Sequence, residues 1–444
     1  MKQNSSHTMS KTKRNNVYSS TKKLVISALV CCLSLSCVTT SNESNKKRKV
    51  NKELTASEIL GNPEYQAISY GGYRAISRDT QPTITQLMND MKILSAMGIK
   101  VLRTYNTHYA QAKNLLEAIS QLKQQDSNFE MYVMLGAWID CENAFKENPN
   151  HNVEDVAANT AEIDRAIKLA TNYPSIVKII AVGNEAMVHW ATSYFVKPDV
   201  ILKWVNYLQD QKEHGILPKS LWITSSDNFA SWGGGGSEYH NEDLEALIKA
   251  VDYVSMHTYP MHDTHYHPVF WGLNDKEATD SKIKNIELAM DKSIEYAKEQ
   301  FARTKAYVHS VDSTKELHIG ETGWASFSAG HYGDEGSRAC DQYKEGLYYK
   351  KMREWTDSEG MSCFYFEAFD EIWKDAKNPG GSENHFGIFS IDGEAKYAVW
   401  DLVDQGLFNG LTRNGNKVIK SFDGDLEKLL EVVKNPPILQ ESAH

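Results

Sequence analysis

Short apolar runs alternate with longer amphipathic stretches from about residue 66 to residue 408. The short runs have the length and apolar content of buried strands, whereas the stretches between them repeat Leu, Ile and Met at helical spacing. The first helical stretch begins with the capping box Thr83-x-x-Gln86 and ends at Gly98. The expected strands are 67–70, 99–105, 131–135, 176–182, 221–225, 251–256, 316–320 and 362–366. The expected later helices are about 109–125, 153–172, 198–214, 241–250, 283–301, 337–355 and 395–408.

This alternation of eight strands with eight helices predicts an α/β protein with the (β/α)8 barrel fold. The alternative is a doubly wound open sheet, which usually carries a glycine-rich phosphate-binding turn after its first strand. Gly71-Gly72 follows the first expected strand but does not match G-x-G-x-x-G, and the sequence contains no GxxxxGK[ST] motif. We therefore expect the barrel.

The first part of the chain differs from the rest. A basic region, an apolar run at 24–35 and Cys37 follow one another in the pattern of a secretory signal. The small residue before Cys37 predicts lipidation of that cysteine, although Ser34 stands where Leu is usual. We expect an exported protein, either a cell-surface or periplasmic lipoprotein or a secreted form, with membrane contact only through the lipid anchor. The predicted segments are a signal peptide at 1–37, a flexible tether at 38–62, a catalytic barrel at 63–410 and a C-terminal extension at 411–444.

The composition of the chain limits the kinds of ligand and cofactor that it is expected to bind. The 444 residues carry a formal net charge of −10, which argues against nucleic acid as a partner. The 10 Trp and 22 Tyr residues fit either core packing or flat surfaces for sugar rings. Beyond the signal segment, Cys141, Cys340 and Cys363 are too widely spaced to indicate a disulfide framework or a zinc site. We expect a monomer that needs no cofactor and no metal.

Two glutamates each end an apolar run. Glu185 follows Ile179–Asn184, and Glu321 follows Leu317–Gly320. In a barrel of parallel strands, both would reach the rim that carries active sites. Two carboxyl groups cleave a glycosidic bond: one protonates the leaving oxygen, and the other attacks the anomeric carbon or activates water. The donor needs a raised pKa, and Asn184 could orient the 2-hydroxyl of the sugar. We predict that Glu185 and Glu321 form a catalytic pair.

The segments Gly183-Asn184-Glu185 and Glu321-Thr322-Gly323-Trp324 resemble the acid and nucleophile motifs of glycoside hydrolase family 17, a retaining family that contains β-1,3-glucanases. The stretches 103–105, 257–260, 369–374 and 383–389 are similar to its other motifs, so the resemblance runs from about residue 68 to 408. It implies that Glu185 is the acid/base and Glu321 the nucleophile. It also implies that Tyr105, Asn184, His257, Tyr259, Glu371, Lys374 and Glu383 line or support the substrate cleft.

Aromatic and charged residues near these motifs complete the expected site. Trp324 and Trp373 lie within motifs, and we predict that both stack on sugar rings. Arg103, Glu367 and Asp370 are expected to support the site, Glu367 by tuning a pKa or holding a hydrogen bond. The family often has Pro where this chain has Ala325, and plant members tend to have Asn at His257, so the chain departs from the family pattern at these two positions. The other tryptophans at strand ends or in loops are Trp138, Trp190, Trp232 and Trp271.

The interpretation is a hydrolase that cleaves laminarin-like β-1,3-glucan by double displacement, with endo and exo action both open. Retention requires carboxyl groups about 5–5.5 Å apart. One alternative is a transglycosylase with the same site, and another is a non-catalytic glycan-binding surface protein. A third is a metal-dependent hydrolase that uses the loop of His257, His262, Asp263, His265 and His267. The histidine spacing matches no usual ligand set, so we expect that loop to be a polar lid.

Overall fold

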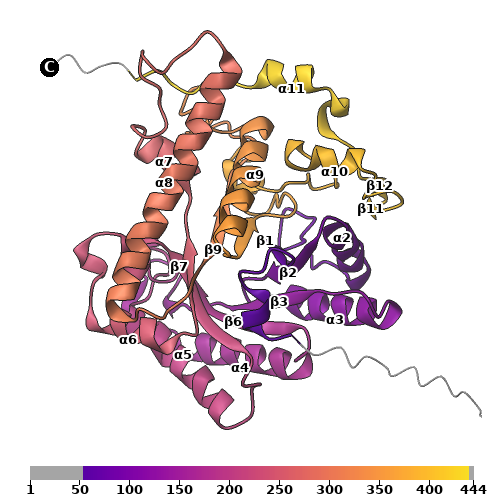
Figure 1. Ribbon diagram of the computed structural model, residues 1–444. Helices are drawn as coiled ribbons and strands as arrows, with labels where there is room; N and C mark the ends of the chain where they lie inside the picture. Colours follow the sequence, from indigo (N-terminus) through magenta and orange to yellow (C-terminus); the bar gives the residue numbers. More distant parts are fainter. Residues whose placement is uncertain (1–53, 440–444) are drawn as a thin grey trace, which may run out of the picture. The chain divides into compact units, whose positions relative to one another are not determined.

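Within residues 54–439, the part of the chain that the structure describes, eight parallel strands close into a barrel covered by helices (Figure 1). The structure is a computed structural model. The strands follow the order β1-β10-β9-β8-β7-β6-β3-β2, and each neighbouring pair is parallel. This is the predicted (β/α)8 barrel. The barrel strands are β1 (Gln66–Ser69), β2 (Ile99–Arg103), β3 (Tyr132–Ala137), β6 (Val177–Asn184), β7 (Trp222–Asn228), β8 (Val254–His257), β9 (Leu317–Gly323) and β10 (Cys363–Phe366).

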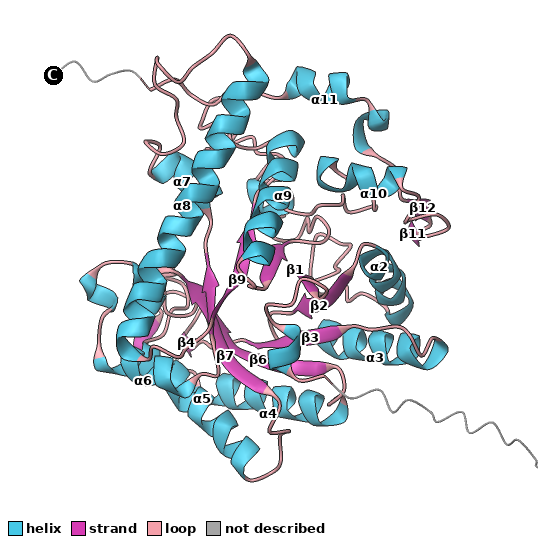
Figure 2. Cartoon of the chain, viewed as in Figure 1, coloured by secondary structure: helices cyan, strands magenta, loops and turns pink. Residues whose placement is uncertain are grey.

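The helices lie outside the strands (Figure 2). The capping box that predicted the first of them is present, because the Thr83 side chain accepts the Gln86 N–H at 3.3 Å while Gln86 Oε1 accepts the Thr83 N–H at 2.9 Å. Gly98, just past the end of that helix, has a φ of 86°, which favours glycine. The outer helices are α2 (Ile84–Ala96), α3 (Ala110–Gln125), α4 (Val156–Asn172), α5 (Pro198–Glu213), α6 (Glu242–Ala250), α8 (Lys282–Val311), α9 (Gln342–Ser358) and α10 (Trp400–Asp404).

Several segments differ from the expectation. The helix expected from residue 153 begins later, at α4, because Asp155 caps it by accepting the Ala158 N–H at 3.0 Å. The residues before this cap form an antiparallel hairpin of β4 (Cys141–Glu142) and β5 (Asn150–Glu154). The histidine-rich segment contains a short helix, α7 (Pro260–Tyr266), rather than loop alone. Short helices also occur at η1 (Ala230–Gly234), η2 (Ser237–Tyr239), η3 (Ser382–Asn384) and η4 (Tyr397–Val399), the last of which shortens the final predicted helix.

The amino end of the barrel is closed by α1 (Ala56–Ile59). Ala56 and Ile59 are buried in one cluster with side chains inside the barrel, among them Phe364 on β10 and Tyr253 just before β8. Gly61 follows at a φ of 74°, and its N–H donates to Ser362 Oγ at 2.9 Å. Residues 54–62 are therefore part of the folded barrel, although the sequence assigned them to the tether, because their apolar side chains fill the open end. The predicted signal peptide, Cys37 and the first part of the tether lie outside the described residues.

The segment after residue 410 packs on the barrel. Arg413 is fully buried, and its Nε lies 3.1 Å from Asp90 Oδ1 on α2. Leu429 is buried in the main core. This segment contains β11 (Thr412–Arg413), β12 (Asn416–Lys417), η5 (Ser421–Gly424) and α11 (Leu426–Val432).

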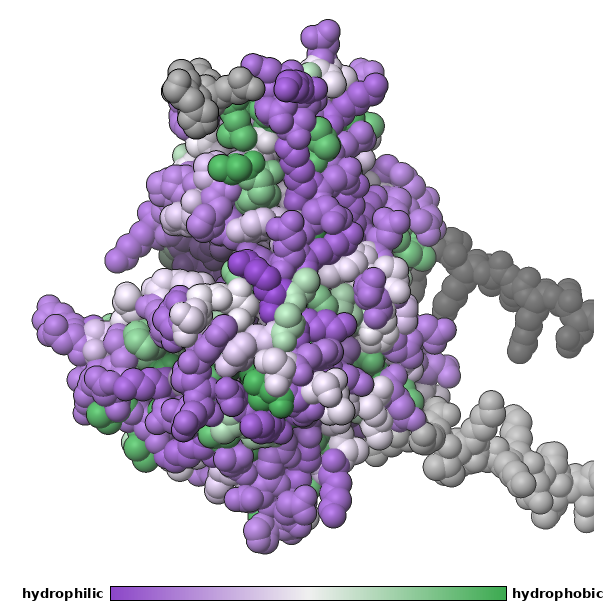
Figure 3. Space-filling view, turned by 60° about the vertical axis from the view of Figure 1, so that its left-hand side comes forward, coloured by the Kyte–Doolittle hydropathy of each residue, from purple (hydrophilic) through white to green (hydrophobic). Residues whose placement is uncertain are grey.

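The surface shown in Figure 3 is mostly hydrophilic, and its apolar side chains form small separate groups. Among the helices within residues 54–439, none combines the length and the apolar character needed to cross a membrane.

Candidate active site

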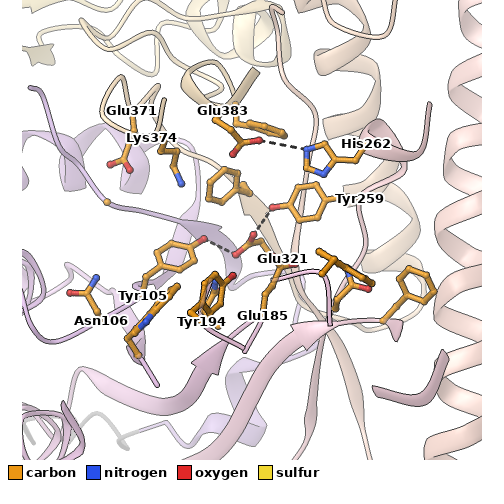
Figure 4. A pocket seen from close by; sticks show the side chains of 18 of the residues that line it. Tyr105, Asn106, Glu185, Tyr194, Tyr259, His262, Glu321, Glu371, Lys374 and Glu383 are labelled. Carbon is orange, nitrogen blue, oxygen red and sulfur yellow. Dashed lines mark hydrogen bonds and ion pairs between the residues drawn. The ribbon is translucent and has the colours of Figure 1, made fainter. Parts of the chain in front are cut away.

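A cleft of about 2350 Å³ opens where the barrel strands end. Pockets for compact small molecules usually measure about 300–1,000 Å³, so this one has room for an extended ligand. Carboxylates, tyrosines and one lysine face each other across it (Figure 4). The labelled lining residues are Tyr105, Asn106, Glu185, Tyr194, Tyr259, His262, Glu321, Glu371, Lys374 and Glu383.

Glu321 lies within β9, and its carboxylate accepts hydrogen bonds at both oxygens. The Tyr259 hydroxyl donates to Oε1 at 2.6 Å, and the Tyr105 hydroxyl donates to Oε2 at 2.8 Å. The guanidinium of Arg103, which is itself buried, also donates to Oε2 and forms an ion pair with it. The close packing of Gly320 against Ser255 on β8 brings this part of β9 next to its neighbour, since a Cβ at Gly320 would lie 2.0 Å from Ser255 Oγ.

These contacts hold Glu321 ionised. Burial alone would raise the pKa of Glu321, but the charges of Arg103 and His257 and the hydrogen bonds from the two tyrosines outweigh it. The pKa of Glu321 is therefore lowered to about 2. A carboxylate in this state is a nucleophile or a charge partner, and not a proton donor, across the ordinary pH range.

Glu185 stands next to Glu321 in the cleft (Figure 4). It follows β6 directly and has a φ of 46°, in the left-handed region that few residues other than glycine adopt. Its N–H donates to Ser226 O on β7 at 3.0 Å, which fixes this turn. The Glu185 side chain is about a quarter exposed (26%), so this carboxyl group is more open to solvent than that of Glu321, which also lines the cleft. The preceding Asn184 accepts a hydrogen bond from Arg103 at 2.5 Å, so one arginine contacts both motifs.

His257 lies beneath Glu185 rather than in the cleft. Its Nδ1 is 3.1 Å from Glu185 Oε1, and its Nε2 is 2.7 Å from Ser226 Oγ. Ser226 Oγ is in turn 2.8 Å from Ser255 Oγ. His257 is completely buried and does not line the cleft, so of the two expected roles it fits support, because it holds the Glu185 carboxyl group.

A half-buried lysine, Lys374, lies on the opposite wall among carboxyl groups. Burial and the charge of Glu371 raise the pKa of Glu367 well above its usual range, and no hydrogen-bond partner for Glu367 Oε1 lies within residues 54–439. Burial lowers the pKa of Lys374, but the charges of Glu367 and Glu371 outweigh it and raise that pKa. The Lys374 ammonium lies 4.2 Å from the ring centroid of Phe366. Glu371 accepts the Tyr73 N–H at 3.1 Å. Lys374 is thus a cation held beside the cleft.

The loop after β10 is held from below and from across the cleft. The buried Asp370 accepts a hydrogen bond from Lys396 Nζ at 2.7 Å and one from the Gly387 N–H at 3.0 Å, which anchors the loop. Glu383 Oε1 lies 3.7 Å from His262 Nε2 on α7, and this contact crosses the cleft (Figure 4). Burial would lower the pKa of His262, but Glu383 outweighs it and raises that pKa.

The sequence of residues 67–387 matches the family model of the BtgE/BtgC glycoside hydrolase domain. This match covers well over half of the chain. The protein belongs to this glycoside hydrolase family. The resemblance to β-1,3-glucanases inferred from the motifs is thereby confirmed at the level of the family.

The chain is similar to three named enzymes. A crystal structure of an endo-laminarinase from Formosa Hel1_33_131 is 59% identical, with a TM-score of 0.86 over 88% of this chain and 100% of that one. A glycoside hydrolase family 17 β-1,3-glucanosyltransferase from Rhizomucor miehei is 18% identical, with a TM-score of 0.51 over 76% and 96%, and shares the fold. The probable glucan endo-1,3-beta-glucosidase btgC of Aspergillus terreus is 23% identical over 75% of this chain, which spans about half (46%) of that relative.

The two tryptophans that were predicted to stack on sugar rings lie in different surroundings. Trp373 lines the cleft and donates to Glu371 at 2.9 Å. Trp324 does not line it: the side chain is fully buried, its Nε1 donates to Ala339 O at 2.8 Å, and it packs on Tyr348 with ring centroids 5.0 Å apart. The prediction of a sugar contact at Trp324 is therefore wrong. Trp324 follows β9 but turns its side chain into the layer between strands and helices.

Some cleft residues were missed. Trp138 and Trp190 line the cleft, and so do Phe145 and Tyr194. Trp138 and Trp190 were both noted as tryptophans at strand ends or in loops, which was a usable signal, whereas nothing local marks Phe145 and Tyr194. Asp227, below the cleft, was also missed: burial raises its pKa to about 7, and its Oδ2 accepts the N–H of Met187, two residues after Glu185.

A metal site would need several histidine, cysteine or carboxylate side chains close together. Across the described residues 54–439, no three or more of these side chains are placed to hold an ion. Cys141, Cys340 and Cys363 are free thiols.

Proposed function

We propose that this glycoside hydrolase is a retaining β-1,3-glucan hydrolase, with Glu321 as the nucleophile and Glu185 as the acid/base. The observation that carries the proposal is the contrast between the two carboxyl groups. Glu321 is buried and held ionised by Arg103, Tyr105 and Tyr259, whereas Glu185 is partly open and contacts one histidine. Two carboxyl groups in different environments are what double displacement requires.

In the first step, Glu321 Oε attacks the anomeric carbon while Glu185 gives its proton to the glycosidic oxygen, which leaves with the released part of the chain. A covalent glycosyl-enzyme forms. In the second step, Glu185, now ionised, takes a proton from water, and the resulting oxygen nucleophile displaces Glu321 with net retention. This route requires a separation of about 5–5.5 Å between the two carboxyl groups, which remains a prediction.

Other residues would serve this chemistry in defined ways. Arg103 contacts both Glu321 and Asn184, so it keeps the nucleophile charged and fixes the amide for the sugar 2-hydroxyl. His257 holds the Glu185 carboxyl group from beneath. Lys374 is a hydrogen-bond donor at the wall, and Trp373 offers a ring for stacking.

Endo action on a laminarin-like chain is supported by the size of the cleft and by the likeness to the endo-laminarinase from Formosa. The signal pattern before residue 38 supports action outside the cytoplasm. The cysteine at the end of that pattern supports attachment to a membrane through a lipid. The partner is then a neutral extracellular β-glucan.

The test is incubation with linear β-1,3-linked hexasaccharide, with products followed by mass spectrometry and anomeric NMR. Shorter products whose β-anomer appears first would support retaining hydrolysis, and internal cleavage would support endo action. Products longer than the substrate would instead indicate glucan transfer. A Glu321→Gln variant should be inactive, whereas Glu316→Gln, an exposed carboxylate just before the same strand, should match the wild type. An inactive wild type, or an α-anomer formed first, would overturn the proposal.

A further inference from the structure

The β4–β5 hairpin contributes to an aromatic cluster on one wall of the cleft. Trp138 follows β3, Phe145 lies in the hairpin turn, and Tyr194 lies between β6 and α5. Ring centroids are 5.2 Å apart for Trp138 and Tyr194, 5.2 Å for Phe145 and Tyr194, and 6.3 Å for Trp138 and Phe145. All three residues line the cleft. Two loops that follow the neighbouring strands β3 and β6 thus meet as one aromatic surface.

Phe145 is an unusual member of this cluster. Its side chain is mostly exposed (63%), although its ring stacks on Tyr194. Its φ is 59°, a left-handed conformation that is uncommon for bulky residues and is found disproportionately at binding sites. The Phe145 N–H donates to Ser193 O at 2.8 Å, and this bond holds the hairpin turn against the loop that carries Tyr194. The turn therefore holds a strained backbone conformation and leaves an apolar ring at the cleft surface.

The Trp138 ring is fixed from behind. Trp138 Nε1 donates to Asp140 Oδ1 at 2.7 Å, and its backbone N–H donates to Glu162 Oε1 on α4 at 3.1 Å. Tyr194 lies close to Glu185 in the cleft (Figure 4). The cluster accordingly begins beside the proposed acid/base and extends outward to Phe145. A rigid, uncharged surface of this kind suits the apolar C–H faces of pyranose rings.

We propose that Trp138, Phe145 and Tyr194 form a binding platform for sugar units of the glucan beyond the cleaved bond. This inference rests on the proposed glucan hydrolysis and adds a determinant of chain length. Phe145 is the outermost ring, so short substrates do not reach it, whereas longer chains cover it. An exposed phenylalanine that gains contact only with long chains makes the enzyme prefer them.

The direct test is Phe145→Ala, assayed on linear β-1,3-linked oligosaccharides from three to seven units. The ratio of kcat/KM for the heptasaccharide to kcat/KM for the trisaccharide should fall about tenfold, as expected when a large aromatic contact is lost. The matched control is Phe327→Ala, since Phe327 is similarly exposed (49%) but does not line the cleft. That control should keep the wild-type ratio.

A second variant separates binding from folding. Phe145→Gly removes the ring but accepts the left-handed backbone, so its Tm should not fall while the ratio falls as for alanine. Calorimetry with the heptasaccharide in a Glu321→Gln background should show weaker binding when Phe145→Ala is added. If the wild type cleaves glucan but the ratio and the affinity are unchanged, the platform is refuted. If the wild type cleaves no glucan, the proposed function itself fails.

Discussion

Tyr259 offers the sharpest test of how this site keeps its nucleophile charged. Its hydroxyl is the only hydrogen-bond donor to Glu321 Oε1 among the described residues, at 2.6 Å. A hydrogen bond to a charged group contributes about 1.5–3 kcal/mol, and one pKa unit corresponds to about 1.4 kcal/mol. Tyr259→Phe should therefore raise the pKa of Glu321 by about 1–2 units from its value of about 2.

The matched comparison is Tyr105→Phe. The Tyr105 hydroxyl donates to Glu321 Oε2 at 2.8 Å, but that oxygen keeps its ion pair with Arg103 when the hydroxyl is removed. The pKa of Glu321 should then rise less than in Tyr259→Phe. Both substitutions keep the ring and its packing, so neither is expected to disturb the barrel.

The assay is kcat/KM against pH from 3 to 7, because this parameter reports the ionisation of the free enzyme. The depressed pKa means that wild-type Glu321 stays ionised until the pH falls toward 2. At pH 3, Tyr259→Phe should lose about two- to tenfold more activity, relative to pH 6, than the wild type does. Coincident acid limbs for the wild type and Tyr259→Phe would refute the reasoning, as would a larger shift in Tyr105→Phe.

Two further predictions follow from the site. Glu185→Gln should lose about 10²–10⁴-fold in kcat on glucan but much less on a substrate with an activated leaving group, and added azide should yield a β-glycosyl azide. No rescue would mean that Glu185 is not the acid/base. Trp324→Ala should lower the free energy of unfolding by about 3–5 kcal/mol because the ring is fully buried, whereas Trp373→Ala should chiefly raise KM. Chemical denaturation and Michaelis kinetics of both variants measure this contrast, and equal stability would contradict it.

The residues that could be predicted are those whose position follows from the strand that carries them. Glu185 and Glu321 both follow apolar runs, and parallel strands bring such ends to one rim, so their meeting was foreseeable. Trp324 shows the limit: it shares a motif with Glu321, but the direction of its side chain after β9 depends on packing against Tyr348. His257 was assigned to the right strand, yet its burial depends on contacts with Glu185 and Ser226, which local sequence does not reveal.

The hairpin was not predictable for a related reason. Asn150–Glu154 is a polar segment without strand periodicity, and it pairs with Cys141–Glu142 only through contacts across the turn. Its aromatic residue, Phe145, then contacts Tyr194 on a different loop. Strands this short and polar, which depend on their pairing partner, are read poorly from periodicity. The capping box at Thr83, by contrast, is a local signal and was read correctly.

The short helix α1 determines how this protein can be shortened for laboratory work. The sequence alone predicts that the barrel begins at residue 63. A truncated form that begins there would lack Ala56 and Ile59, whose side chains fill the end of the barrel. Full burial of one large apolar side chain contributes about 1.5–3 kcal/mol. The truncated form would also leave Tyr253 and Phe364 open to water. Versions made for crystallisation or for tagging at the amino end should therefore begin at or before residue 54, so that α1 still covers the amino end of the barrel.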